Sequence, residues 1–340
     1  MTDTTRPLVT FALFAYNQEK YIREAVEGAF SQTYEPLEII LSDDCSSDRT
    51  FEIMQEMAAA YEGPHQVRVR RNDCNVGTAL HVQLAFEESK GELFVVAAGD
   101  DISFAKRVSS ICSTWEQAGR PIGAIHSGRE TFIEGSPESL KVIPLKRNKY
   151  SNNILECYAR GMWLPAAAPT CAYTRDIFDR FDPLLGGSII EDLPLMLRVA
   201  LIGKFVECEE ALVKQRIHSQ NSGTGYTHRL PSSWNRFIMS KAVAFRNMQI
   251  DLNSADHDIE HSLKQHIEQK VISALHSTSS LVMSETRKLS VFGKICFAAK
   301  MLLSPAVTRT LRLRAEYTLS FMGFSFHSTL KNWMRVWLKV

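Results

Sequence analysis

Two adjoining stretches, LVTFALFAYNQEKYIREAVEGAF at residues 8–30 and EPLEIILSDD at residues 35–44, decide the fold of this chain. Residues 8–15 form an apolar run, which is typical of a strand buried on both faces of a parallel sheet. Between residues 18 and 32 the apolar side chains recur at helical spacing, and residues 37–41 are again strand-like. The order strand, helix, strand predicts the start of an α/β layer structure.

The same alternation continues along the chain. We expect a helix over 48–61 with Asp48 as its cap, a strand over 67–69, a helix over 78–89 and a strand over 93–97. Less regular elements follow: helices over 103–118 and 191–202, strands over 122–126, 171–174 and 212–217, and a polar connection over 134–153. The predicted fold class is α/β, with a doubly wound, mixed but mostly parallel sheet.

The pattern changes near residue 230. Residues 232–285 and about 291–338 have helical periodicity with few turn signals, so we expect two domains, 1–230 and a helical region 231–340. From residue 287 onward, ten basic residues stand against one acid, Glu316. Trp333 and Trp337 lie one helical turn apart in this tail, as in amphipathic helices on anionic membranes. Packing on the protein itself or on a second subunit is the alternative.

The overall composition excludes several classes of protein. The 340 residues include 39 Lys and Arg against 38 Asp and Glu, which argues against a disordered chain and against one that coats nucleic acid. The seven cysteines form no C-x-x-C pair, as expected of buried thiols in a reducing compartment. We find no secretory leader and no apolar run long enough to span a membrane. We therefore expect a cytoplasmic protein, peripheral at most on the inner face of the cell membrane.

Acidic residues follow the predicted strands where α/β sheets bind ligands. Asp43 and Asp44 follow the second strand, Asp100 and Asp101 follow the fourth, and the pair Glu191-Asp192 opens a helix. Helix capping and turn formation would explain any one of these residues alone. Two adjacent carboxylates after a buried strand repel each other unless a cation joins them.

A divalent cation is the natural partner of such a pair. Mg²⁺ and Mn²⁺ commonly bind to one or two carboxylates together with the phosphates of a nucleotide. The sequence contains no Walker-type phosphate loop, and no Gly-x-Gly-x-x-Gly follows the first strand. The acidic clusters therefore predict a nucleotide site in which metal and side chains hold the phosphates.

Five short motifs in this order resemble the family 2 glycosyltransferases with the GT-A fold, over roughly residues 8–225. The segment Ala15 to Ile22, continuing to the Ser-Gln-Thr-Tyr at 31–34, is similar to the family's opening helix and turn. Asp43 to Thr50 resembles its nucleotide loop, and the Asn-Val-Gly at 75–77 its Asn-x-Gly. Ala98 to Asp101 resembles its D-x-D region, although Ala98 stands where an acid is often found. Glu191-Asp192 resembles the pair that supplies the base.

The resemblance implies an inverting transfer of a sugar from a nucleotide-diphosphate donor, a UDP- or dTDP-sugar, to the hydroxyl of a saccharide or lipid-linked saccharide. The role implied is cell-surface polysaccharide or lipopolysaccharide assembly in bacteria, with Mn²⁺ or Mg²⁺ as cofactor. The site residues carried over are the base Asp192 with Glu191 beside it, the metal ligands Asp101 and His218, and the nucleotide-binding residues Ala15, Tyr16, Asp44, Asp100 and Arg216.

Two other functions remain open from the sequence. A nucleotidyltransferase also uses carboxylates and Mg²⁺ on a doubly wound sheet, but it usually has a glycine-rich loop after the first strand, where this chain has Ala15 to Glu19. A catalytically silent module that only binds a nucleotide sugar is the second. The joint presence of Asp44, Asp101 and Asp192 argues against it.

Overall fold

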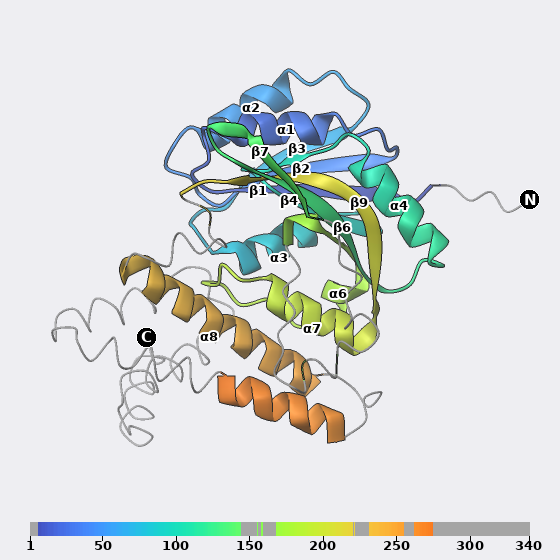
Figure 1. The fold of residues 1–340 in the computed structure, drawn as a ribbon, viewed down its shortest axis with the longest axis vertical. Helices are drawn as coiled ribbons and strands as arrows, with labels where there is room; N and C mark the ends of the chain where they lie inside the picture. The colour runs from blue at the N-terminus through green and yellow to red at the C-terminus, as the bar shows by residue number, and fades with distance from the viewer. Residues whose placement is uncertain are drawn as a thin grey trace, which may run out of the picture.

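The computed structural model describes residues 6–143, 155, 158, 168–219, 221, 231–254 and 262–274. Its first half alternates strands and helices as the sequence predicts (Figure 1). The elements are β1 (Val9–Ala15), α1 (Ile22–Phe30), β2 (Leu37–Asp43), α2 (Thr50–Ala59), β3 (Gln66–Arg71), α3 (Thr78–Glu88) and β4 (Leu93–Ala98). The N-cap of α2 is Arg49 and not the expected Asp48, which precedes it and accepts the Thr50 amide on Oδ1 at 3.0 Å.

The second half of the fold is less regular. It contains β5 (Ile102–Ser103), α4 (Arg107–Gln117), β6 (Gly123–Ile133), β7 (Ser136–Ile143), β8 (Cys171–Thr174), α6 (Asp176–Asp179), α7 (Asp192–Ile202), β9 (Lys204–Ile217) and α8 (Pro231–Ser254). A further helix covers residues 262–274. The predicted polar connection at 134–153 is wrong in its first part, because residues 136–143 pair with β6 as an edge strand.

One mixed sheet unites the strands in the order β3-β2-β1-β4-β8-β6-β9-β5, with β7 paired to β6. The strands β3, β2, β1 and β4 are parallel, so this half of the sheet is wound as predicted. The strand β8 enters antiparallel between β4 and β6, and β6 and β9 are parallel to each other. The predicted α/β fold class is therefore confirmed.

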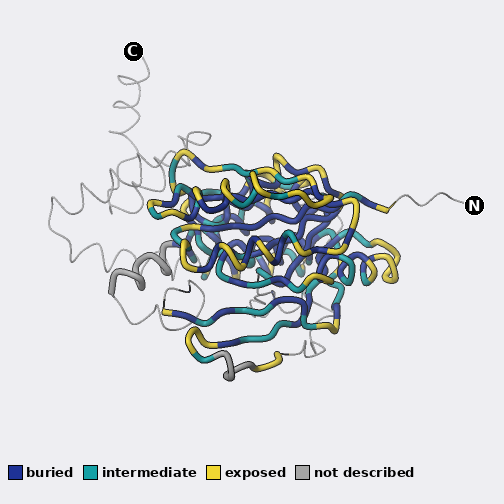
Figure 2. Tube along the Cα trace, turned by 90° about the horizontal axis from the view of Figure 1, so that it is seen from above, coloured by how far each residue is buried: buried dark blue, intermediate teal, exposed yellow. Residues whose placement is uncertain are grey.

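The sheet is covered on both faces (Figure 1). The helices α1, α2 and α4 pack one apolar cluster against one face, and α3, α6, α7 and α8 pack a second cluster against the other. Figure 2 shows buried residues gathered at the centre, with exposed residues toward the outside. Phe245, Met248 and Leu252 of α8 belong to the second cluster, so the first helix after residue 230 packs on the sheet domain. The domain division itself stays a prediction.

The expected helical region over about 291–338 and the basic tail from residue 287 onward both lie outside the described residues. Within the described ranges, no helix combines the length and the apolar character needed to cross a membrane.

Phe94 anchors the second apolar cluster beneath β4. It is fully buried, and its ring lies 5.6 Å from that of Phe86 and 5.7 Å from that of Phe178, centroid to centroid. Phe94→Ala should lower the free energy of unfolding by about 3 to 5 kcal/mol, because it leaves a cavity between these rings. Chemical denaturation measures the loss, and Val142→Ala, at a residue 60% exposed, is the control that should change little.

Candidate active site

Three loops, two of them acidic, meet at one edge of the sheet because of strand register. The parallel strands β1, β2 and β4 end side by side, with Ala15 opposite Asp43 and Phe14 opposite Ala98. The residues that follow these strands therefore emerge at the same carboxyl edge. Register alone brings Tyr16, Asp44 and Asp100 to this edge, as the sequence predicts.

Asp44 is held rigidly at the edge. Its Oδ1 accepts hydrogen bonds from Asn72 Nδ2 at 2.8 Å and from the Val76 amide at 2.9 Å, and its Oδ2 accepts the Gly77 amide at 3.0 Å. Burial raises the pKa of this carboxyl group, and these three donors act against the rise. Asp44 is only 3% exposed, so a ligand group can reach it from one direction only.

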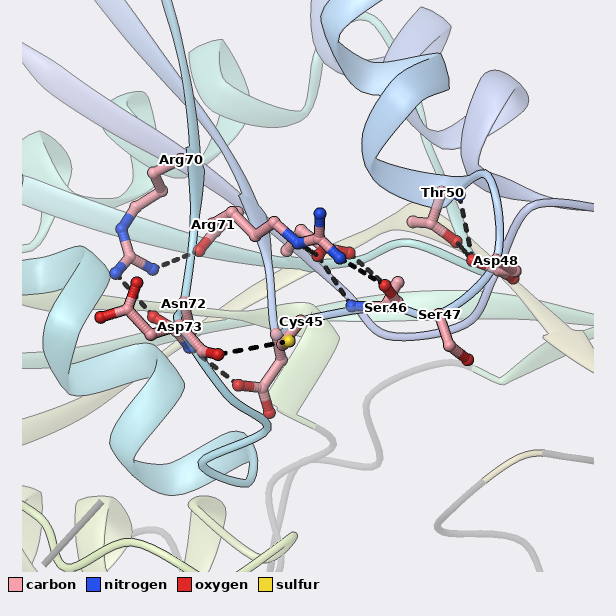
Figure 3. A network of polar contacts seen from close by, with 12 residues as sticks. Cys45, Ser46, Ser47, Asp48, Thr50, Arg70, Arg71, Asn72 and Asp73 are labelled. Atoms are coloured by element: carbon pink, nitrogen blue, oxygen red, sulfur yellow. Dashed lines mark hydrogen bonds and ion pairs between the residues drawn. The ribbon is translucent and has the colours of Figure 1, made fainter. Parts of the chain in front are cut away.

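Sequence reasoning missed the residues that support Asp44. Arg70 donates from Nη2 to Asn72 Oδ1 at 2.8 Å and from Nη1 to Ser42 Oγ at 2.6 Å. Figure 3 shows Arg70 and Asn72 side by side, with Arg71 reaching across to the turn at Ser46. The one sequence signal is their spacing: side chains two residues apart in an extended segment share a face, as Arg70 and Asn72 do.

The end of β1 forms the neighbouring wall. The Asp44 amide donates to the Ala15 carbonyl at 2.9 Å, so the two predicted nucleotide-binding positions are joined by backbone. Ala15 itself is buried, whereas the Tyr16 side chain is 39% exposed. An exposed aromatic ring beside a buried carboxylate is suited to contact a flat, partly polar ring such as a nucleobase.

Asp100 and Asp101 are both tied to the end of β9. Asp101 Oδ1 accepts the Arg216 amide at 2.9 Å, whereas Asp100 Oδ2 lies 3.0 Å from His218 Nε2 and 3.2 Å from Asn221 Nδ2. Burial and then the neighbouring Asp100 raise the pKa of Asp101 well above the ordinary value for aspartate. The two adjacent acids thus differ in surroundings: Asp101 is enclosed, and Asp100 faces the imidazole.

Arg216 braces the end of β9 from several sides. Its guanidinium group lies 5.0 Å from the centre of the Tyr21 ring and 4.7 Å from that of Phe132, and it forms an ion pair with Glu24 at 3.1 Å. Its Nε also donates to the Asp100 carbonyl at 3.2 Å. Arg216 is only 7% exposed, so in this structure it chiefly stabilises the segment that carries His218.

The donor set at Asp100 fits a divalent cation. A carboxylate oxygen and an imidazole nitrogen lie 3.0 Å apart and come from different segments. The carboxylate suits Mn²⁺ or Mg²⁺, whereas an imidazole ligand favours a transition metal such as Mn²⁺ over Mg²⁺. Among the described residues, no group of three or more His, Cys, Asp or Glu side chains has the geometry of a metal cage. Mg²⁺ sites that share a nucleotide commonly use only one or two protein carboxylates, so two convergent side chains suffice.

Glu191 and Asp192 stand at the start of α7, as predicted. Asp192 Oδ1 accepts the amide of Leu193 at 2.9 Å. The sequence suggests that the helix dipole keeps Asp192 ionised, but burial has the larger effect and raises its pKa to about 6. Burial and the charge of Asp192 raise the pKa of Glu191 further. The pair therefore holds one proton more readily than two ordinary carboxyl groups would.

A buried arginine and a buried thiol lie near the acidic residues. Asp192 and Arg107 both influence the pKa of the Cys171 thiol, which burial raises to about 12, and Asp101 in turn influences the pKa of Arg107. Arg107 is fully buried and donates to the carbonyls of Val96 at 2.7 Å and Pro169 at 2.6 Å. Sequence reasoning missed this arginine, because inside a helical pattern it resembles an ordinary surface residue.

A mixed sheet with acidic loops at its carboxyl edge defines the class of GT-A glycosyltransferases, and comparison with known proteins agrees. The described structure resembles Staphylococcus aureus TarS in complex with UDP-GlcNAc (TM-score 0.57, 16% identity, 92% of this chain and 87% of that one). It also resembles the mannosyltransferase PcManGT of Pyrobaculum calidifontis in complex with GDP-Man and Mn²⁺ (TM-score 0.51, 16% identity, 94% and 87%). At these identities the likeness establishes the fold.

The sequence comparisons establish the family. The profile described as "Glycosyl transferase family 2" matches residues 10–179. An uncharacterized glycosyltransferase of Haemophilus influenzae is 25% identical over 75% of this chain and 77% of its own length, and one of Rickettsia typhi is 24% identical over 69% and 73%. The chain belongs to glycosyl transferase family 2, as the motifs around Asp44, Asp101 and Asp192 predict.

Gly77 is the point where the Asp44 loop touches the segment before Glu191. Its φ is +81°, and a Cβ atom there would lie 2.8 Å from the Ser188 carbonyl oxygen. Gly77→Ala should therefore cost about 1 to 3 kcal/mol of stability through backbone strain. It should also weaken binding of UDP, since the Gly77 amide holds Asp44. Thermal melting and calorimetry with UDP measure the two effects, and unchanged UDP affinity would show that this loop does not serve a nucleotide.

Proposed function

We propose that this protein transfers a sugar from a nucleotide-diphosphate donor to an acceptor hydroxyl with inversion at the anomeric carbon. The carrying observation is that the nucleotide-type acidic loop, the Asp100-Asp101 pair and the Glu191-Asp192 pair belong to one fold whose parallel strands end at one edge. The complexes of the two structural neighbours, one with UDP-GlcNAc and one with GDP-Man, support a nucleotide-sugar donor. Cell-surface polysaccharide or lipopolysaccharide assembly is the role that we propose from the family resemblance.

In this proposal the nucleotide occupies the wall formed by β1 and β2. Asp44, fixed by three N–H donors, accepts a hydrogen bond from the N–H edge of a uracil or thymine base. Ala15 and the exposed ring of Tyr16 border the same base. Because Asp44 cannot rotate without losing its own donors, it selects bases by the position of a single N–H group.

Inversion in one displacement requires a single base on the acceptor side, and Asp192 fits this role. A base works best when its pKa is near the working pH, and burial brings Asp192 close to that range. Glu191, with the higher pKa, remains protonated beside it and spares Asp192 a second negative charge. Asp192 then takes the proton of the acceptor hydroxyl as that oxygen attacks.

We assign the divalent cation, Mn²⁺ or Mg²⁺, to Asp100 and His218, with Asp101 holding the Arg216 amide behind them. The enclosed position of Asp101, with one oxygen taken by the Arg216 amide, makes Asp100 the better direct ligand of the two. A bound cation would stabilise the negative charge of the departing diphosphate. Arg216 keeps His218 in place through its ring and carbonyl contacts.

The direct test of the function is a panel of UDP-, dTDP- and GDP-sugars incubated with the protein and Mn²⁺, with release of the nucleotide diphosphate as the readout. We expect slow release from one donor class, because water can replace a missing acceptor. Binding of a nucleotide sugar without release would favour the catalytically silent module. Release of pyrophosphate from a nucleoside triphosphate plus a sugar phosphate would favour a nucleotidyltransferase.

Asp192→Asn removes the proton acceptor while it preserves size. It should lower the transfer rate by at least about 10²-fold and leave UDP affinity unchanged. In the parent protein the rate should fall as the pH drops through the raised pKa of Asp192, about 6, because the protonated form accepts no proton.

Steady-state rates at several pH values measure both effects. Glu191→Gln is the matched control, since Gln resembles the protonated carboxyl group and should retain most of the rate at neutral pH. Near-parental transfer by Asp192→Asn would exclude Asp192 as the base.

Asp100→Asn and His218→Ala should abolish the increase in UDP affinity that Mn²⁺ produces, because each removes a proposed ligand. Asp101→Asn should weaken it less, because the asparagine Oδ1 can still accept the Arg216 amide and neither proposed ligand is removed. Calorimetry with and without Mn²⁺ compares the three variants. Loss of the Mn²⁺ effect in Asp101→Asn alone would return the ligand role to Asp101, the residue that the resemblance favours.

The tail from residue 287 onward is proposed to contact anionic membrane peripherally, where lipid-linked acceptors lie. The support is its excess of ten basic residues over one acid. Such attraction amounts to about 1 kcal/mol per basic residue near the surface and weakens with salt. Co-sedimentation with anionic liposomes should therefore be lost on truncation near residue 286. Equal sedimentation of the truncated and full chains would favour a packing role instead.

A further inference from the structure

The helix α8 lies outside the residues that the family profile matches, yet it contacts the segment that leads into the proposed base. We name residues 182–190, between α6 and the Glu191-Asp192 pair, the bridging segment. Figure 1 shows α8 running along α7 on the same side of the sheet. The position of Asp192 thus depends on what holds the bridging segment.

Two buried polar residues of α8 hold it. The side chain of Ser240 accepts the Ile189 amide at 3.2 Å, and its carbonyl accepts the Ser188 hydroxyl at 3.0 Å. Asn247 Oδ1 accepts the Leu185 amide at 2.9 Å. All of these α8 groups are at most 2% exposed, so water cannot easily replace them.

A buried ion pair fixes the start of the bridging segment to both helices. Asp251 of α8 pairs with Arg198 of α7 at 2.9 and 3.0 Å, and each side chain is only 1% exposed. Arg198 Nη2 also donates to the Asp182 carbonyl at 2.6 Å. Arg198 belongs to α7 and is bonded to both α8 and the bridging segment. It therefore connects these three elements.

The opposite side of the bridging segment contacts the loop that holds Asp44. The Gly187 amide donates to the Val76 carbonyl at 2.8 Å, and the Ala79 amide donates to the Ser188 carbonyl at 3.1 Å. The amides of Val76 and Gly77 are the donors to Asp44. Only backbone hydrogen bonds therefore separate the α8 contacts from the nucleotide-side carboxylate.

We propose that α8 is a positioning element of the active site, in which Ser240 and Asn247 fix the bridging segment and thereby the placement of Asp192 relative to the Asp44 loop. This inference rests on the proposed role of Asp192. It assigns to the C-terminal region a part in catalysis that is separate from membrane contact. The catalytic unit then extends at least to residue 254.

Ser240→Ala and Asn247→Ala each remove one acceptor from a buried amide without changing the sheet. We expect the turnover of nucleotide release to fall by roughly 10-fold to 10²-fold, the scale of a small misplacement of reacting groups. The KM for the nucleotide sugar and the affinity for UDP should stay near the parental values, because Asp44 keeps its own donors. Turnover is calculated per UDP-binding site counted by calorimetry, because loss of folded protein would otherwise lower the apparent turnover at an unchanged KM.

Ser254→Ala is the matched control: the same change on the same helix, at an exposed residue that bonds only to carbonyls of α8. It should leave turnover unchanged. Ser240→Thr retains the hydroxyl acceptor and should recover much of the lost rate. Amide hydrogen exchange gives a readout without donor or acceptor: exchange at Leu185 and Ile189 should speed up in the matching variant, with the melting temperature little changed.

The outcomes distinguish a failure of the positioning role of α8 from a failure of Asp192 as the base. If Asp192→Asn abolishes nucleotide release while Ser240→Ala and Asn247→Ala keep the parental turnover, α8 has no positioning role. If Asp192→Asn retains release, the assignment of the base fails, and faster exchange at Leu185 and Ile189 then shows only that α8 anchors the bridging segment. Loss of apparent turnover matched by an equal loss of UDP-binding sites would point to general destabilisation and would also overturn the positioning role.

Discussion

Carboxyl groups removed from water need hydrogen-bond donors or positive charge around them, and much of this structure meets that need at one edge of the sheet. Asp44 has three N–H donors, Asp101 has the Arg216 amide, and Asp100 faces His218 and Asn221. These groups come from the segment between β3 and α3, from the end of β9 and from the residues that follow β9. The fold can therefore be understood as a support that keeps acidic side chains buried, fixed and reactive.

The secondary structure of the first half and the positions of the acidic residues along the chain could be predicted from the sequence. Apolar periodicity located β1, α1 and β2, and the parallel register of these strands followed from the α/β alternation. The prediction that Asp44, Asp100 and Asp192 follow strands or open helices needed only neighbouring residues. The edge strand β7 was missed because its alternation is interrupted by charged and proline residues that resemble a loop.

The interactions that hold the acids could not be predicted in this way. Asn72 reaches Asp44 across 28 residues, and Arg216 reaches Asp101 across 115. The pKa of Asp192 also required the structure, because burial by distant segments outweighs the helix dipole that the sequence makes visible. Ser240 and Asn247 carried no sequence signal at all, since polar residues on a helix usually face water.

The central claim is that Asp44, Asp100 and Asp192 surround a single nucleotide-sugar site. A crystal structure of the protein with UDP and Mn²⁺ tests it most directly. We expect the uracil N–H at Asp44, the cation with the diphosphate at Asp100 and His218, and the end of the diphosphate directed toward Asp192. Density for UDP and Mn²⁺ at any other place, with Asp44 and Asp100 uncontacted, would contradict the account.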